Sequence, residues 1–305
     1  MFAEKRGLIT GAHRSGTTWL GRVVAKAPDV SVLHEPFNRD WGMAGVPSWY
    51  PYWSPAGEGP VIDKLVCDLL SGRAKYVRNH ATDNFIKARL RRAIGGRSEL
   101  QYRRARLAQR RNLILKDPLA LLLTPRLATQ YGFKAVILVR HPGAFLVSLR
   151  RMSWESTVDW LSDKKEFVRA HAPYLASIDA GSSVAYRTGL FWRALYSFAI
   201  KAAEDRPEAV RLARHEDLSL DPVVHLSPVL SHLGIDDISP SMEFAMRSTM
   251  GDTILPPAGK LHEFERDAKS LMTSWQSEIA KDEMEELRQA AAPIVDRLYP
   301  DMPWP

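Results

Sequence analysis

The sequence has one cysteine, Cys67, among its 305 residues. A single cysteine excludes an internal disulfide, and we expect the chain to work in a reducing compartment. The sequence also lacks a run of about 18 apolar residues, the length that spans a bilayer. Its first residues do not show a basic stretch followed by an apolar one, the pattern of a secretory signal. We therefore expect a soluble, cytoplasmic protein and leave open a peripheral contact with a membrane surface.

A further absence is a lysine in the loop near the start of the chain, where Leu8–Trp19 reads LITGAHRSGTTW. The spacing from Gly11 to Gly16 matches the common nucleotide-binding loop, but Thr17 stands where that motif has its lysine. The stretch predicts a strand, a turn and the first turn of a helix, whose unpaired N–H groups bind anions. Arg14 supplies positive charge inside the turn. The loop is therefore predicted to be a variant anion cradle.

Strand and helix patterns alternate along the chain. Five short apolar runs predict strands, at 8–10, Val30–His34, Asn112–Lys116, Ala135–Arg140 and Ala209–Ala213. Their continuous apolar character is typical of strands buried on both faces. We expect an α/β fold, with a P-loop-like parallel sheet of about five strands flanked by helices on both faces. The length fits a single domain, 1–305, with an aromatic and basic insertion at about 39–111.

Several helices are predicted between these strands. Helical patterns cover Val61–Leu70, Thr82–Ile94, Glu99–Arg110, Leu119–Tyr131 and Phe191–Glu204. A long helical stretch rich in aromatic residues is expected after residue 150, and a last helix over Glu283–Leu298. The segment Arg39–Pro60, rich in Trp, Tyr, Pro and Gly, predicts a long irregular loop.

The net charge of +7 is concentrated in one block, 71–111. Thirteen Lys and Arg residues there face two acids, Asp83 and Glu99. Such a block indicates an anionic partner, either an anionic glycan or a membrane surface, and a pair of solvated basic helices explains it equally well. No nucleic-acid-binding motif accompanies the charge, so nucleic acid is the least favoured partner.

Charged residues follow separate predicted strands at the point where each strand ends. They are Arg14, Glu35, Lys116 and Arg140. Because ligands of open parallel sheets bind beyond the carboxyl ends of the strands, we expect these four side chains to share one crevice. Each alone has a structural reading, such as a surface ion pair, and it is their convergence that favours a site.

With these residues in place, the sequence resembles sulfotransferases that use 3′-phosphoadenosine 5′-phosphosulfate (PAPS), in particular bacterial-type members similar to carbohydrate sulfotransferases. GAHRSGTTW resembles the family's 5′-phosphosulfate loop, and ILVRHPGAFLVS resembles its 3′-phosphate segment. RHEDL and the late ERDAKSLMTSW resemble two further nucleotide-binding elements. The resemblance implies PAPS as co-substrate, 3′,5′-adenosine bisphosphate (PAP) as product and no required metal. The residues it assigns to the nucleotide are Arg14, Ser15, Gly16, Thr17, Thr18, Trp19, Arg140, Ser148, His215, Arg266 and Lys269.

The chemistry of sulfuryl transfer agrees with these residue types. A sulfuryl group carries less charge than a phosphoryl group, so protein cations can support its transfer without Mg²⁺. Arg14 is expected to neutralise the leaving phosphate, with Lys116 between the transferring group and the acceptor. HEPF resembles the segment that carries the proposed base in carbohydrate-modifying members, which implies Glu35 as the base and His34 as its alternative.

The predicted function is PAPS-dependent O-sulfation of a saccharide, a glycolipid or a related hydroxyl acceptor. A tyrosine peptide or a small metabolite remains an alternative acceptor. Two other classes stay open, a P-loop nucleotide or small-molecule kinase and a polyanion-binding protein of the same fold without activity. Thr17 in place of the loop lysine and the second phosphate segment at Arg140 and Ser148 argue against the kinase.

Overall fold

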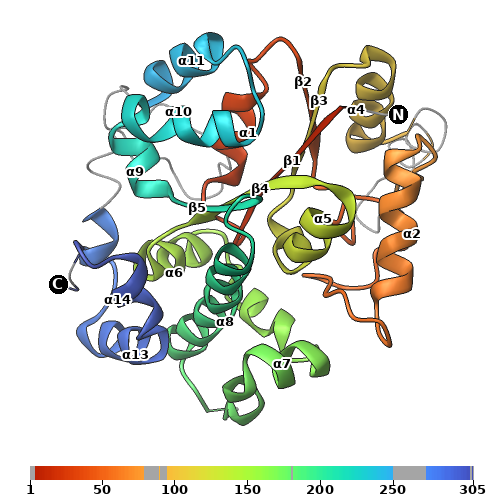
Figure 1. The fold of residues 1–305 in the computed structure, drawn as a ribbon. Helices are drawn as coiled ribbons and strands as arrows, with labels where there is room; N and C mark the ends of the chain where they lie inside the picture. Colours follow the sequence, from red (N-terminus) through yellow and green to blue (C-terminus); the bar gives the residue numbers. More distant parts are fainter. Residues whose placement is uncertain are drawn as a thin grey trace.

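The computed structural model describes residues 4–78, 89, 95–179, 181–249, 273–302 and 304. Five parallel strands form one sheet in the order β2-β3-β1-β4-β5 (Figure 1). The strands are β1 (Lys5–Gly11), β2 (Val30–His34), β3 (Asn112–Lys116), β4 (Phe133–Val139) and β5 (Val210–Arg214). The predicted bounds of β2 and β3 are confirmed, and those of the other three strands differ by one to three residues.

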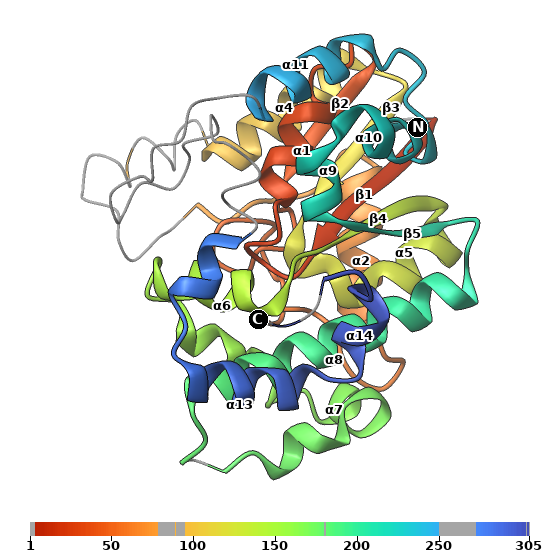
Figure 2. The ribbon, with the colours of Figure 1, turned by 90° about the vertical axis from the view of Figure 1, so that its left-hand side faces the viewer.

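The two faces of the sheet are both buried, as the continuous apolar runs predicted. Alternate residues of a strand enter different apolar clusters, so that Leu8 faces one side of β1 and Ile9 the other. On the Ile9 side lie α1 (Thr17–Val24), α10 (Pro222–His232) and α11 (Ser239–Thr249). On the Leu8 side lie α2 (Gly59–Leu70), η1 (Pro118–Leu123), α5 (Thr124–Tyr131) and α8 (Val184–Asp205). The predicted α/β sheet with helices on both faces is confirmed (Figures 1 and 2).

Two helix predictions are wrong, and proline contributes to both. The stretch after residue 150 is not one long helix but three short pieces, η2 (Glu155–Leu161), α7 (Lys165–His171) and η3 (Pro173–Ser177). The last helix is split into α13 (Lys281–Ala291) and α14 (Ile294–Leu298) on either side of Pro293. Pro173 and Pro293 have no backbone N–H to continue a helical ladder, and their rings crowd the preceding turn.

The remaining described elements are four further helices. They are α4 (Arg97–Ala108), α6 (Pro142–Arg150), α9 (His215–Leu220) and η4 (Ser274–Ser277). The loop over 39–58 is irregular as predicted. Four of its aromatic residues pack into the core beside the Leu8 face, namely Trp49, Tyr50, Tyr52 and Trp53. The predicted helix Thr82–Ile94 lies outside the described residues, apart from Arg89.

Much of the described basic block holds α4 in place. Arg78 and Arg103 both pair with the buried Glu99. Arg106 donates to Gly72 O at 2.8 Å, and Arg110 donates to the carbonyl of Val30 at 2.6 Å. These contacts favour the structural explanation of the charge for the part of the block that the structure describes.

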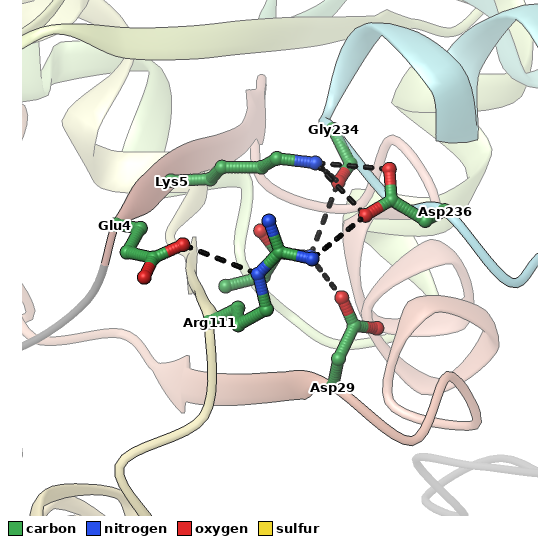
Figure 3. Close-up of polar contacts among 7 residues, drawn as sticks. Glu4, Lys5, Asp29, Arg111, Gly234 and Asp236 are labelled. Atoms are coloured by element: carbon green, nitrogen blue, oxygen red, sulfur yellow. Dashed lines mark hydrogen bonds and ion pairs between the residues drawn. The ribbon is translucent and has the colours of Figure 1, made fainter.

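A polar cluster fastens the amino edge of the sheet, opposite the ends at which functional residues were predicted (Figure 3). Lys5 Nζ lies 2.9 Å from Asp236 Oδ1, and Arg111 Nη1 lies 3.5 Å from Asp236 Oδ2. The fully buried Asn112 donates from Nδ2 to Asp29 Oδ2 at 2.6 Å and to Gly234 O at 3.1 Å. The start of the chain is thereby tied to the α10–α11 connection, and the start of β3 to the α1–β2 connection.

Candidate active site

A predicted functional residue stands at the carboxyl end of every strand of the sheet. Arg14 follows β1, Glu35 follows β2, Lys116 ends β3, Arg140 follows β4 and His215 follows β5. Since all five strands are parallel, these ends lie at one edge. The backbones of Arg14, Glu35, Lys116 and Arg140 therefore lie along one edge of the sheet, and the sharing of one crevice by their side chains stays a prediction. The side chains form two groups joined by the loop between β1 and α1.

The first group is centred on an ion pair between Lys116 and Glu35. Lys116 Nζ lies 2.7 Å from Glu35 Oε1 and 3.3 Å from Thr18 Oγ1. The Lys116 side chain is 2% exposed, whereas that of Glu35 is 23% exposed. The carboxylate therefore faces solvent at the edge of the sheet, and the ammonium group reaches it from the interior.

The backbone of β3 and the turn after β2 position Glu35. Its N–H donates to Lys116 O at 2.8 Å, which continues the β2–β3 pairing past the end of β2. Its φ of 50° is left-handed, a conformation that is strained for a residue with a side chain. Asn38 stabilises the turn from within, because its Nδ2 donates to Glu35 Oε2 at 2.9 Å and its Oδ1 accepts the N–H groups of Asp40 and Trp41.

Lys116 reaches the site along helix α1 at a position without a side chain. A Cβ added to Gly21 would lie 2.7 Å from Lys116 Cγ and 3.3 Å from Lys116 Cβ, well inside van der Waals contact. The absence of a side chain at Gly21 therefore leaves the path that the aliphatic part of Lys116 follows.

The charges around Glu35 keep it ionised. Burial alone would raise the pKa of Glu35, but attraction to Lys116 and His34, together with hydrogen bonds from Lys116 and Asn38, outweighs burial and holds its pKa below the ordinary value. His34 is half exposed, and its Nε2 lies 3.8 Å from Glu35 Oε1. Both candidate bases thus lie together, with the glutamate closer to the lysine.

Asp117 is a buried acid next to Lys116 whose positioning contacts sequence reasoning missed. It is fully buried, and its carboxylate accepts the N–H of Phe37 at 2.6 Å and that of Leu119 at 3.0 Å. Burial raises the pKa of Asp117 to about 7, and repulsion from the Glu35 carboxylate is the second cause of the increase. Asp117 therefore joins the turn after β2 to the start of η1. An aspartate before proline is a helix-capping pattern, and this pattern was the sequence signal that could have identified it.

The second group contains Arg14, Ser148 and Arg140. Arg14 Nε donates to Ser148 Oγ at 3.1 Å, and Arg140 Nη1 donates to Arg14 O at 2.9 Å. Arg14 has a left-handed φ of 68°. Burial lowers the pKa of Arg140 to about 10, so that Arg140 remains a cation at neutral pH. The two segments that were predicted to hold different phosphates are in direct contact.

His215 and Trp19 lie against the helical end of the loop. Gly16, with a φ of 88°, is so close to His215 that an added Cβ would lie 2.4 Å from its Nδ1. Trp19 is 7% exposed and packs in the apolar cluster on the Ile9 side of the sheet, with Nε1 donating to Ser248 Oγ at 2.9 Å. The structure therefore places the Trp19 side chain in the core.

Two other predicted nucleotide residues, Ser15 and Thr17, have buried side chains. Ser15 is fully buried and its hydroxyl bonds to Tyr196 Oη at 2.9 Å, and Thr17 is 3% exposed. Their backbone groups remain part of the loop and of the first turn of α1. Arg266 and Lys269 lie outside the described residues.

A cavity of about 360 Å³ lies away from both groups. Its lining includes Tyr52, Trp53, Arg126 and Phe198, and none of the predicted site residues contributes to it. Within the described ranges, no three or more His, Cys, Asp or Glu side chains gather as they would around a metal ion. The helices in the described part of the chain are also too short or too polar to cross a bilayer.

Comparisons with known proteins give structural matches only. No protein-family model matches the sequence, and no curated protein matches it. The sulfotransferase domain from the curacin biosynthetic pathway is similar with a TM-score of 0.52 and 16% identity, over 99% of both chains. The sulfotransferase domain from the Synechococcus PCC 7002 olefin synthase has a TM-score of 0.46 and 15% identity over 99% of this chain and 97% of its own. A sulfotransferase from Alicyclobacillus acidocaldarius has a TM-score of 0.44 and 19% identity over 98% and 95%. Along nearly its whole length, the chain has the fold of a sulfotransferase domain.

Proposed function

We propose that this protein is an O-sulfotransferase that takes its sulfuryl group from PAPS and transfers it to a hydroxyl of a saccharide, a glycolipid or a related acceptor. The observation that carries the proposal is the pair formed by Lys116 Nζ and Glu35 Oε1 at 2.7 Å, beside Thr18 at the start of α1. A general base and a cation stand there next to an anion-binding loop, on a fold shared with a sulfotransferase domain.

The donor set fits an anionic nucleotide. Two guanidinium groups and a hydroxyl lie at one end of the loop, on Arg14, Arg140 and Ser148. The first N–H groups of α1 lie at the other end. Arginine binds phosphate with a planar set of donors and stays charged. When bound, PAPS would supply the sulfuryl group, and the residues of this chain would bind it, orient it and neutralise the charge on its leaving phosphate.

Glu35 is the proposed base, and Lys116 controls when it acts. As long as Lys116 donates to Glu35, the carboxylate is a weak base, because the ion pair favours its ionised form. If the ammonium group turns toward charge that develops nearby, Glu35 loses that stabilisation and accepts the proton of the acceptor hydroxyl more readily. His34, 3.8 Å from the same oxygen, is the alternative base.

The proposal for a sugar acceptor rests on the segment after Glu35. The loop over 39–58 contains Trp41, which is 43% exposed, and aromatic rings of this kind bind the apolar faces of sugars. Helix α4 adjoins the end of β2, since Gln101 Oε1 accepts the N–H of His34 at 3.2 Å. We further propose that the chain is one domain with an acceptor-binding insertion over about 39–111, and that it acts in the cytoplasm.

Two measurements test the function. Calorimetric titration with PAP in the absence of metal should show binding, and binding of ATP with Mg²⁺ in place of PAP would contradict the proposal. Transfer of radiolabelled sulfate from PAPS should then be screened over glycan, glycolipid, tyrosine-peptide and small phenolic acceptors. Sulfated product from tyrosine peptides or small phenols alone would support the sulfotransferase activity and contradict the proposed sugar acceptor.

Substitution of the base separates binding from turnover. Glu35→Gln should lower kcat by about 100-fold or more and leave the affinity for PAP within about threefold, because the amide keeps the shape but cannot take a proton. Glu243→Gln on α11 is the matched control, since this exposed glutamate pairs with Arg247 far from the edge of the sheet. Unchanged turnover in Glu35→Gln would assign the base to another group.

A further inference from the structure

His13 is a buried imidazole next to Arg14 that the proposed reaction does not use. Its side chain lies at the centre of the aromatic packing beside the anion-binding loop, and the residue is 5% exposed. Five aromatic rings lie with their centroids between 5.4 and 6.4 Å from that of His13: Tyr50, Phe145, Trp154, Trp160 and Phe191. A polar group this deeply buried needs hydrogen-bond partners, and both of its ring nitrogens have one.

The hydrogen bonds of His13 fix its tautomer. Nε2 lies 2.8 Å from Thr157 Oγ1, which donates its own proton to Trp154 O at 2.7 Å, so that Nε2–H must be the donor to Thr157. Nδ1 is then the acceptor from the Tyr50 hydroxyl at 2.8 Å. The Tyr50 oxygen in turn accepts the backbone N–H of His13 at 2.9 Å. Burial lowers the pKa of His13 to about 3, which keeps the imidazole neutral and this arrangement unique.

The two partners of His13 belong to segments on the acceptor side of the proposed site. Tyr50 is fully buried in the middle of the loop over 39–58, the loop that follows Glu35. Thr157 lies in η2, and η2 packs on the same loop through Trp49 and Trp160, which stack at 4.3 Å with an interplanar angle of 8°. His13 thus contacts the acceptor loop directly and also contacts the element that lies against it.

The chain of contacts returns to Arg14. Trp154, whose carbonyl accepts the Thr157 hydroxyl, is 37% exposed, and its ring centroid lies 5.9 Å from the Arg14 guanidinium carbon. Arg14 and Tyr50 both have left-handed backbones, with φ of 68° and 49°. Such conformations persist only where surrounding contacts hold them. A change in the conformation of Arg14 must therefore change either His13 or the contact with Trp154.

We propose that His13 is a positioning residue that couples the occupancy of the donor loop to the conformation of the acceptor side, through Tyr50 to the loop over 39–58 and through Thr157 to η2. The inference rests on the proposed function, because it takes the anion-binding loop as the donor site. Binding of the nucleotide to Arg14 orders the loop. The hydrogen bonds of His13 then restrict the motion of the residues around Tyr50 and Thr157.

Tyr196 provides a matched comparison within the same loop. Its hydroxyl accepts the N–H of Ala12 at 3.2 Å, lies 2.9 Å from Ser15 Oγ and donates to Leu138 O at 2.9 Å. The buried hydroxyl groups of Tyr50 and Tyr196 therefore each accept a hydrogen bond from a backbone N–H of the loop. Tyr196 belongs to α8, and the three partners of its hydroxyl lie outside the loop over 39–58 and outside η2.

Hydrogen–deuterium exchange read by mass spectrometry tests the coupling with PAP as the probe and needs no acceptor. In the parent protein, PAP should slow amide exchange about fivefold in peptides covering 44–56 and 154–161, because local opening becomes less frequent when the loop is ordered. Tyr50→Phe should lose this protection at 44–56 while its affinity for PAP changes by about threefold or less. Tyr196→Phe should keep the protection. Thr157→Val, which removes the partner of His13 Nε2, should lose the PAP-dependent protection at 154–161. This variant keeps the test informative if Tyr50→Phe does not fold.

The outcomes separate this inference from the proposed function. Failure of the parent protein to bind PAP by calorimetry would overturn both. Binding of PAP without protection of either peptide would overturn the coupling alone. Equal protection in the parent, Tyr50→Phe and Thr157→Val proteins would overturn the role of His13, since the effect would then reach the acceptor side by another route.

Discussion

Replacement of His141 by asparagine should change how the stability of the protein depends on pH. His141 precedes α6, and its Nδ1 accepts the N–H of Gly143 at 3.2 Å, so that the imidazole caps the helix. The ring is fully buried and stacks on Trp275 with a centroid distance of 4.4 Å. Asparagine is a favoured cap and can accept the same N–H, so that His141→Asn removes the titrating group and keeps the cap.

The magnitude follows from the burial of His141. Burial lowers the pKa of His141 from 6.5 to about 3. A depressed folded-state pKa means that the neutral form stabilises the fold above the ordinary pKa, and that this stability is lost as the pH falls from 6.5 toward 3. At about pH 5 the unfolded imidazole is protonated by a ratio of about 30 to 1, which corresponds to about 2 kcal/mol.

Urea unfolding at about pH 7.5 and about pH 5 measures the effect. The loss of the stacked ring gives His141→Asn a constant deficit, and the other titrating groups are common to both proteins. The advantage of the parent protein in the free energy of unfolding should therefore shrink by about 2 kcal/mol between the two pH values. Parallel curves for the parent and His141→Asn would refute the reasoning.

Three further predictions concern other parts of the structure. Gly143→Ala should lower the free energy of unfolding by about 1–3 kcal/mol in urea, because the new Cβ would lie 2.2 Å from Trp275 Cε3. Gly181→Ala should be nearly neutral, because beyond the chain neighbours its new Cβ would come no closer than 3.9 Å to another atom, Asp179 Oδ1. Ser148→Ala should weaken the binding of PAP by about 10-fold in calorimetry, since Arg14 loses the hydroxyl that positions its guanidinium group; unchanged affinity would contradict the predicted phosphate contact. Asn112→Ala should cost about 1–3 kcal/mol in the same urea assay without a change in the affinity for PAP, because it disrupts only the amino edge of the sheet. Lys5→Ala, which removes an exposed ion pair of that cluster, should cost less than about 1 kcal/mol.

The sheet could be predicted from the sequence because its strands carry a strong local signal. The apolar runs of β2 and β3 end at His34 and Lys116, and a polar or charged residue followed by proline marks the end of each pairing. Since parallel strands place their ends at one edge, the positions of Arg14, Glu35, Lys116 and Arg140 followed from the fold class alone. Which side chains pair there did not follow, because the contact of Arg14 with Ser148 depends on the left-handed turn at Arg14.

The parts that could not be predicted depend on contacts between residues far apart in the chain. The hydrogen bond between His13 and Thr157 joins residues 144 positions apart, and no local sequence pattern predicts it. The aromatic residues after residue 150 suggested one long helix, but Trp154 and Trp160 pack around His13 and Trp49 from a short 3-10 segment. Charge counting likewise could not show that Arg106 and Arg110 would be used to hold carbonyl groups.

The close packing of Gly21 on Lys116 has a consequence for how the proposed site can be altered. The helix that begins at the anion-binding loop contacts the aliphatic part of the lysine at Gly21 and its ammonium group at Thr18. A methyl group at residue 21 would displace the ammonium group from Glu35 and leave its charge in place. Gly21→Ala should then raise the pKa of Glu35 toward the value that burial alone favours, and the acid limb of a pH–activity profile would move upward with it. The basicity of the proposed site is in this way adjustable from a buried position on α1.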